Sequence, residues 1–409
     1  MKVLHIIAGD LSGGAAKGAY NLHKALITSG ESSHIFNNTL SKNDPSVSVS
    51  INSDKKKVLE VLKRKIEALV LKFYPKRIDR IFSMGFVGFN FIKTNEYKEA
   101  DIIHLHWINS SFVNMKILAN IDKPIIWTVR DMWPLTGGCH YSLDCTRYTA
   151  NCGKCPQLGS NNEFDLSRII LNRKIKYLPR NLTAVGISPW VSEILNRSTL
   201  FKDKRVVQIN NCIDTTEFFP ISKKKAREVL GIKTDKNILL MGANSVTDFY
   251  KGFDKCIESL KKLDTQRYFL LFFGNLDESS VIDLGFEYRS MGYITDVISL
   301  RLIYSSATIF IAPSIMEAFG KTLIESMACK TPVVCFNATG PKDIVTHKVD
   351  GYKAKPFSTT SLANGIEWVV NNDNYEELCE KAREKVVNEF DSVVVAKQYI
   401  SLYKDILNK

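Results

Sequence analysis

The sequence has no apolar run that approaches the roughly 18 consecutive residues a transmembrane helix needs. Its first residues, MKVLHIIAGD, also lack the charged lead and the cleavage site of a secretory signal. We therefore expect a cytoplasmic protein. No helix-turn-helix, RRM or basic stripe interleaved with aromatic residues is visible, so we expect no nucleic-acid partner.

A disulfide framework is not expected either, because nine cysteines, an odd number, lie in a long chain without a secretory signal. Four of them have the spacing C-x5-C-x6-C-x2-C, which offers four soft ligands for a tetrahedral zinc ion. The alternative is a set of reduced, buried thiols. These four candidates for a structural zinc site are Cys139, Cys145, Cys152 and Cys155.

Length and composition indicate two domains, since 409 residues exceed what one hydrophobic core usually organises and 45% of them are hydrophobic. Strand-like runs such as KVLHIIA, DIIHLHW and NILLMGA alternate with helical patterns, as in a parallel sheet covered by helices on both faces. The formal net charge of +12 favours anionic partners.

Two carboxylates flank the start of a short helical pattern that follows the strand-like run ATIFIA. Glu317 lies in the loop after this run, and Glu325 lies within the helical segment that begins after Gly320. The carboxyl ends of parallel strands form the ligand crevice of such sheets, and a helix N-terminus attracts anions. We expect a phosphate-bearing ligand beside the two glutamates. The alternative is a pair of solvated surface carboxylates.

The whole segment resembles the signature of the family 4 glycosyltransferases, P-S-x-x-E-x-F-G-x-x-x-x-E-x-x-A-x-x-x-P-V. The matching residues are Pro313, Ser314, Glu317, Phe319, Gly320, Glu325, Ala328, Pro332 and Val333, and Thr331 replaces the usual glycine. The resemblance implies an α/β fold of the GT-B class, in which two Rossmann-like doubly wound domains face a central cleft. It also implies retention of anomeric configuration and no metal requirement for catalysis.

The segment NCIDTTEFFP resembles the connection between the two domains of this family, with Cys212 in place of glycine. We therefore expect an acceptor-side domain over residues 1–212 and a nucleotide-sugar-binding domain over 213–390. The resemblance implies that residues 391–409 form a helix that crosses back to the first domain.

The family's donor site maps onto several residues of this sequence. The resemblance implies that Lys251 neutralises the departing diphosphate, that Glu317 orients the donor sugar and that Glu325 holds the ribose. The loop with Gly13 and Gly14 would close over the donor, although it could equally be a tight turn only. The remaining expected donor contacts are Gly242, Tyr293, Ile294, Phe319, Gly320 and Lys321.

The acceptor side departs from the family pattern in the segment WTVRD. Arg130 stands where related enzymes often have histidine, while Asp131 is retained. A permanently charged arginine cannot act as a base, but it can bind phosphate or an acidic sugar. We expect acceptor-side roles for His106, Arg130 and Asp131, with Asp131, Lys251 and Glu317 as catalytic residues. The alternatives are an ion pair between Arg130 and Asp131 and a core role for the histidine.

Residues 55–80 hold ten lysines or arginines against three acids. Apolar side chains recur there at helical spacing, namely Val58, Leu62, Ile66, Leu69 and Phe73. This basic amphipathic pattern predicts docking on the anionic inner face of the cell membrane. The alternative is an ordinary core helix with a solvated basic face.

Together these patterns predict a retaining glycosyltransferase. We expect it to move a sugar from a UDP- or GDP-sugar to a lipid-linked or growing polysaccharide acceptor, such as capsule, exopolysaccharide or O-antigen. Two alternatives are a nucleotide-sugar epimerase of the same fold and a noncatalytic nucleic-acid-binding or scaffold protein.

Overall fold

The computed structural model describes residues 1–39, 44–51, 53–78, 80–246 and 248–408. The chain forms two compact units. Unit 1 comprises Met1–Asn210 together with Val395–Lys409, and unit 2 comprises Asn211–Val394. The expected domain boundary at 212/213 thus lies two residues beyond the division in the structure.

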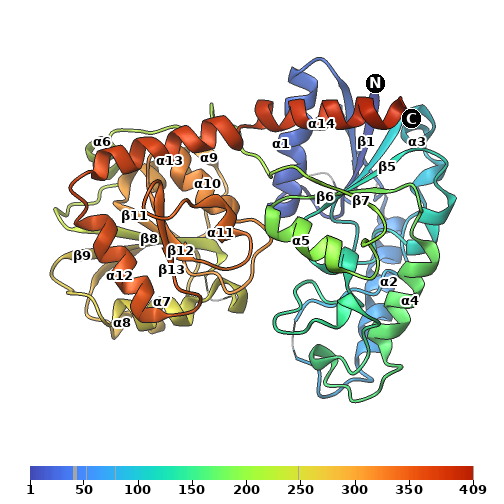
Figure 1. Ribbon diagram of the computed structural model, residues 1–409, viewed down its shortest axis with the longest axis horizontal. Coiled ribbons are helices and arrows are strands. Elements are labelled where there is room, and N and C mark those ends of the chain that lie inside the picture. The colour runs from blue at the N-terminus through green and yellow to red at the C-terminus, as the bar shows by residue number, and fades with distance from the viewer. Residues whose placement is uncertain (40–43, 52, 79, 247, 409) are drawn as a thin grey trace. The chain divides into compact units, whose positions relative to one another are not determined.

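Unit 1 is built on a sheet of seven strands, all parallel, in the order β3-β2-β1-β4-β5-β6-β7 (Figure 1). The strands are β1 (Lys2–Ile6), β2 (Ser32–Asn37), β3 (Val47–Val49), β4 (Ile102–Leu105), β5 (Ile125–Val129), β6 (Thr183–Gly186) and β7 (Arg205–Gln208). The central strands are buried and apolar because helices cover both faces of a parallel sheet. The strand order reverses between β1 and β4, which makes their carboxyl ends a topological switch point.

Several helices of unit 1 begin at side-chain caps. Ser53 caps α2 (Asp54–Leu71), Asp165 caps α4 (Leu166–Tyr177), and Ser188 caps α5 (Pro189–Arg197). The other helices are α1 (Gly14–Thr28) and α3 (Asn95–Glu99). Among the described residues, no helix combines the length and the apolar content that crossing a bilayer requires.

The last helix, α14 (Ser392–Leu407), completes the core of unit 1 from Val395 onward. Tyr399 and Tyr403 are buried. The hydroxyl of Tyr403 lies 2.7 Å from Nδ1 of His104 in β4, and that of Tyr399 lies 2.8 Å from Oγ1 of Thr128 in β5. The end of the chain is therefore hydrogen-bonded to two central strands of the first sheet.

Unit 2 contains a six-stranded parallel sheet in the order β10-β9-β8-β11-β12-β13. Its strands are β8 (Asn237–Ser245), β9 (Tyr268–Asn275), β10 (Glu287–Ser290), β11 (Ile309–Ala312), β12 (Val333–Phe336) and β13 (Gly351–Ala354). The order reverses between β8 and β11, so these strands form the second switch point.

Helices cover both faces of this sheet (Figure 1). One face carries α7 (Phe253–Leu260), α8 (Ser279–Ile282) and α12 (Thr359–Val370). The other carries α6 (Lys223–Val229), α9 (Val297–Ser306), α10 (Lys321–Ala328) and α13 (Tyr375–Glu389). The remaining short helix is α11 (Pro341–Ile344). The expected α/β class with two Rossmann-like units is confirmed.

One sequence-based alternative is wrong. The apolar residues Val58, Leu62, Ile66, Leu69 and Phe73, read above as the inner stripe of a core helix, are all exposed. The residues of α2 that are buried are Glu60, Glu67 and Leu71. The helix has the expected periodicity, but its acidic stripe faces the body of unit 1.

Candidate active site

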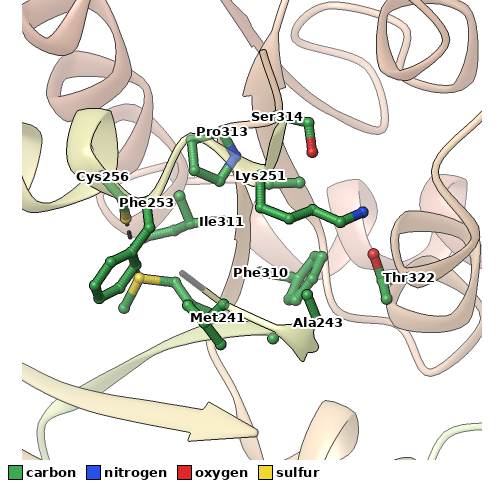
Figure 2. Close-up of a pocket in the computed structure, with 13 residues that line it drawn as sticks. Met241, Ala243, Lys251, Phe253, Cys256, Phe310, Ile311, Pro313, Ser314 and Thr322 are labelled. Carbon is green, nitrogen blue, oxygen red and sulfur yellow. Dashed lines mark hydrogen bonds between the residues drawn. The ribbon is translucent and has the colours of Figure 1, made fainter. Parts of the chain in front are cut away.

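A pocket lies at the switch point of unit 2, where β8 and β11 end (Figure 2). Its walls come from the end of β8, the 3-10 turn Phe249–Lys251, the end of β11 and the first turn of α10. The side chains of Lys251, Ser314 and Thr322 bring their polar ends to one side of this pocket. The remaining lining is mostly apolar, including Met241, Phe253, Phe310 and Ile311.

Lys251 and Glu317 are joined directly. The Nζ atom of Lys251 lies 3.0 Å from Oε1 of Glu317, and the hydroxyl of Ser314 donates to Oε2 at 2.9 Å. The backbone of Glu317 is also fixed, since its N–H donates to Oγ1 of Thr339 at 3.2 Å and its carbonyl accepts from the N–H of Gly340 at 2.9 Å. The carboxylate is therefore held beside a lysine that lines the pocket.

Two glycines allow these loops to approach one another. Gly252 has φ +65°, and a Cβ there would lie 2.1 Å from the carbonyl oxygen of Pro313. Gly320 has φ +116° and precedes the first residue of α10. Both conformations strongly favour glycine, so a side chain at Gly252 would push Lys251 away from the end of β11.

Glu325 lies in α10 and is buried. Its Oε1 lies 3.0 Å from Nζ of Lys321, and its Oε2 accepts a hydrogen bond of 2.9 Å from the hydroxyl of Tyr304 in α9. Burial and the neighbouring carboxylate raise the pKa of Tyr304 well above its ordinary value. Both oxygens of Glu325 are thus already engaged within unit 2.

The other residues of unit 2 that were expected to contact the donor lie in different environments. Gly242 lines the pocket at the end of β8. Tyr293 is exposed and Ile294 is half-buried. They lie in a loop whose residue Gly292 accepts, through its carbonyl, a hydrogen bond of 2.7 Å from the N–H of Gly274 near the end of β9. Phe319 is buried against Phe390, with ring centroids 5.7 Å apart, so it has the contacts of a core residue.

Gly13 and Gly14 lie at the start of α1, where Gly13 is the N-cap without a side-chain hydrogen bond. A Cβ at either position would meet nothing within 4 Å. Within unit 1 these glycines therefore leave the first amide groups of α1 uncovered, as an approaching anion would require.

Asp131 follows β5 and is buried in a polar cluster. Its Oδ2 accepts from Nε1 of Trp107 and lies near Nδ1 of His140, both at 2.7 Å, and its Oδ1 accepts from the N–H of Trp133 at 3.0 Å. His140 extends this hydrogen-bonded cluster, because its Nε2 lies 2.9 Å from the hydroxyl of Ser83. No motif in the sequence indicates Trp107 or Ser83 as neighbours of this cluster.

Arg130 and His106 belong to a second buried series of hydrogen bonds. The Nε–H of Arg130 donates to Nδ1 of His106 at 3.3 Å, so Nε2 of His106 carries the proton. That nitrogen lies 2.8 Å from Nδ1 of His5, which leaves the protonated Nε2 of His5 buried and, among the described residues, without a hydrogen-bond partner. Burial, followed by neighbouring positive charge, lowers the pKa of both histidines well below the ordinary value. His106 is therefore a neutral residue of the core.

The four cysteines between 139 and 155 are free thiols that line one cavity of unit 1. Tetrahedral zinc would bring all four sulfurs to within about 4 Å of one another, given Zn–S bonds of about 2.3 Å. Within the described part of the chain, His5, His104 and His106 form a group of ligand atoms within 4.8 Å, whereas the thiols form no such group. The thiol arrangement as it stands does not fit a closed zinc site. Zinc stays a prediction, which metal analysis of the purified protein tests.

Residues 222–386, which contain the whole pocket of unit 2, match the profile of the family described as Glycosyl transferases group 1. This segment of unit 2 is therefore similar to that family. The match covers the strands β8 and β11 and the segment with both glutamates, so the family resemblance seen in the sequence is confirmed.

Curated relatives are also glycosyltransferases. An uncharacterized glycosyltransferase, MJ1607, of Methanocaldococcus jannaschii is 26% identical over 44% of this chain and 47% of its own length. The capsular polysaccharide biosynthesis glycosyltransferase CapM of Staphylococcus aureus is 24% identical over 55% of this chain and 62% of its own. The chain thus spans about half to three fifths of these relatives. An Escherichia coli relative that carries the name "Putative colanic acid biosynthesis glycosyl transferase WcaC" is 22% identical over 84% of this chain and 85% of its own length.

Solved structures share the fold over the full length. Sucrose-phosphate synthase from Thermosynechococcus elongatus has a TM-score of 0.71 at 20% identity, covering 100% of both chains. Anabaena Alr3699/HepE, in complex with UDP and glucose, has a TM-score of 0.66 at 16% identity, covering 99% of this chain and 100% of its own. The GT-B class is confirmed, and neither the epimerase nor the nucleic-acid-binding alternative is favoured.

Proposed function

We propose that this chain is a retaining glycosyltransferase that moves a sugar from a nucleoside diphosphate sugar to a lipid-linked or growing polysaccharide acceptor. The observation that carries the proposal is the junction of Lys251, Glu317 and Ser314 at the β8/β11 switch point. It lies within the residues that match the family.

The chemistry requires a cation beside a carboxylate. As the bond between the anomeric carbon and the phosphate oxygen breaks, negative charge grows on the departing diphosphate, and a fixed cation stabilises it. Lys251 supplies that cation. Glu317, held by Ser314 and its backbone contacts, then accepts hydroxyl donors of the sugar. The acceptor oxygen forms the new bond to the anomeric carbon as the bond to the phosphate oxygen breaks, and its proton passes to the departing diphosphate.

Glu325 has a different role in this proposal. Because Tyr304 and Lys321 already engage its two oxygens, we assign it to ribose binding through a carboxylate whose position is fixed in advance. A carboxylate oxygen has more than one lone pair, so an additional hydroxyl can donate to it.

Asp131 and Arg130 belong to the acceptor side in this proposal. Asp131 is held by Trp107, His140 and the N–H of Trp133, which fixes the direction of its carboxylate. We assign Asp131 to orientation of the acceptor. Arg130, which donates a hydrogen bond to His106, would contact an anionic group of the acceptor. His106 is then a positioning residue.

The names of similar proteins guide the choice of donor and acceptor. HepE was solved with UDP and with UDP-glucose, so we rank UDP-sugars ahead of GDP-sugars. A Campylobacter jejuni relative, 24% identical over 52% of this chain, is named as acting on a diphospho-undecaprenol saccharide, which favours a lipid-linked acceptor.

The test begins with UDP- and GDP-sugars. A ligand that binds only the native state raises its stability, by roughly 3 kcal/mol at 100 times Kd, so the true donor shifts the thermal transition. Lys251→Met and Glu317→Gln should reduce this shift. The donor is then incubated with undecaprenyl-diphosphate saccharides, and the anomeric configuration of the product is read by NMR.

Three results would contradict the proposal. One is the absence of stabilisation by any nucleoside diphosphate sugar. Another is conversion of the donor into an isomer without acceptor, which would identify an epimerase. The third is a product of inverted configuration, which would remove the retaining assignment while keeping the transferase.

A further inference from the structure

Helix α2 presents its apolar side chains to solvent. Seven of them, here called the apolar face of α2, have exposed fractions between 47% and 80%: Val58 69%, Leu59 51%, Val61 54%, Leu62 52%, Ile66 47%, Leu69 58% and Phe73 80%, the last just beyond the helix. An ordinary surface helix of a globular protein buries this kind of face. A continuous exposed apolar surface of this kind marks a site of contact with another body.

The inner face of α2 is polar, which fixes this orientation. Glu60 and Glu67 are buried, two turns apart, and Leu71 follows on the same side. Glu67 faces Ser111 and the backbone of Gly85 and Phe86, and burial raises its pKa above the ordinary value. Rotating the helix to bury its apolar face would remove these contacts and place both acids in solvent.

Cations flank the apolar face. Six lysines and arginines of residues 55–72 are exposed: Lys55, Lys56, Lys57, Arg64, Lys65 and Lys72. The two acids within this range, Glu60 and Glu67, are both buried on the opposite side. The exposed surface of α2 therefore combines apolar and positively charged side chains.

We propose that α2 docks on an anionic lipid membrane, parallel to its plane, with the apolar face of α2 among the acyl chains and the flanking lysines and arginines at the headgroup phosphates. Long basic side chains can extend their charged ends to the headgroups while their methylenes stay near the acyl chains. The inference rests on the proposed function, in which a lipid-linked acceptor is presented at such a surface.

A second copy of the chain fits this face less well. In a twofold contact the same surface meets itself, so the exposed cations of one α2 would face those of the other. Asp54, the one exposed acid of residues 54–72, already pairs with Lys57 at 3.2 Å, which leaves the other exposed cations without an acid opposite them. Charge complementarity therefore favours an anionic bilayer.

The test is flotation of the full chain with two kinds of vesicle, phosphatidylcholine alone and phosphatidylcholine mixed with phosphatidylglycerol. We expect binding to the anionic vesicles. Reversal of three charges, Arg64→Glu with Lys65→Glu and Lys72→Glu, should weaken this binding by roughly 100-fold or more, given the attraction of each basic residue to anionic lipid. Leu62→Glu with Leu69→Glu should abolish it.

Matched controls come from unit 2. Lys224, Lys233 and Lys262 are exposed, and reversing all three changes the net charge by the same amount. Val229 and Ile298 are as exposed as the leucines, at 57% and 64%, and Val229→Glu with Ile298→Glu matches the apolar variant. Both controls should float like wild type, and thermal unfolding of every variant shows that it is folded.

Absence of flotation with anionic vesicles, or equal flotation of the α2 variants and their controls, would overturn the proposal. So would a concentration-dependent dimer, seen by sedimentation without lipid, that Leu62→Glu with Leu69→Glu dissociates. Stabilisation of the α2 variants by nucleotide sugar is measured in parallel. It should equal that of wild type, so loss of docking and loss of donor binding are distinguishable.

Discussion

The ammonium group of Lys251 lies 3.0 Å from the carboxylate of Glu317, although the two residues are 66 positions apart in the chain. Lys251 ends a 3-10 turn after β8, and Glu317 follows β11, so the pair bridges the two strands of a switch point. Without substrate, the carboxylate holds the lysine in place. In the proposed reaction, a bound diphosphate would give the same lysine a second anion to contact.

Replacing Lys251 with methionine should lower kcat by about 100- to 1000-fold, the typical cost of losing one fixed group that stabilises developing charge. The free energy of unfolding should change by less than about 1 kcal/mol, because the pair is partly exposed. Steady-state kinetics and urea unfolding measure the two effects. Lys255→Met is the control, since Lys255 forms an exposed pair with Asp254. A wild-type rate in Lys251→Met would remove the assignment.

Glu325→Ala should abolish turnover and also destabilise unit 2 by about 1–3 kcal/mol. The reason is that the buried hydroxyl of Tyr304 would lose its acceptor. Glu325→Gln keeps an acceptor of similar shape, so it should recover much of the stability but little of the activity. Calorimetry and initial rates separate these outcomes. If Glu325→Ala unfolds at the wild-type temperature, the contact with Tyr304 is not stabilising.

The buried histidines make the fold sensitive to acid. His5, His104 and His106 have pKa values well below the ordinary 6.5, chiefly through burial. The unfolded chain therefore binds more protons below about pH 6.5, and stability present above that pH should fall as the pH drops. Urea unfolding across this range measures the slope.

His104→Gln tests the contribution of one ring in this group. Glutamine does not titrate, so the loss of stability with acid should become shallower, although the variant starts about 1 kcal/mol less stable because hydrogen bonds to Thr128 and Tyr403 change. An unchanged slope would mean that His104 does not contribute to the acid sensitivity.

Lys174 gives a dependence of the same sign at higher pH. It is fully buried, its ammonium group lies 3.8 Å from the centre of the Trp133 ring, and it donates to the carbonyl of Thr136 at 2.9 Å. Burial lowers its pKa from 10.5 to about 7. The unfolded chain then binds the extra proton between these values, so stability should rise with pH across this interval, by on the order of 4 kcal/mol. In Lys174→Met this rise should be much smaller, and a parallel curve in urea unfolding would refute the assignment.

The family resemblance predicted that Lys251 and Glu317 belong to one donor site. The structure brings the two residues together because the carboxyl ends of neighbouring parallel strands share one edge of the sheet. The sequence motifs could not supply Tyr304 as the partner of Glu325. That contact joins α9 and α10, and nothing in either helical pattern records which residues of another helix they face.

The orientation of α2 shows the same limit. Its sequence contains two stripes at helical spacing, one apolar and one formed by Glu60, Glu67 and Leu71. Periodicity groups residues onto a face but does not say which face packs inward. Here the face with Glu60, Glu67 and Leu71 packs inward, and Glu67 faces the backbone of Gly85 and Phe86. Phe319 is a similar case, since a motif residue proved to be packed against Phe390.

The hydrogen bond between His104 and Tyr403 joins residues 299 positions apart. A ribosome makes His104 long before Tyr403, so the first sheet is synthesised with a part of its core still missing. Unit 2, which is continuous, can fold as soon as it emerges, whereas unit 1 must wait for α14. The unit synthesised first is therefore the unit that is completed last.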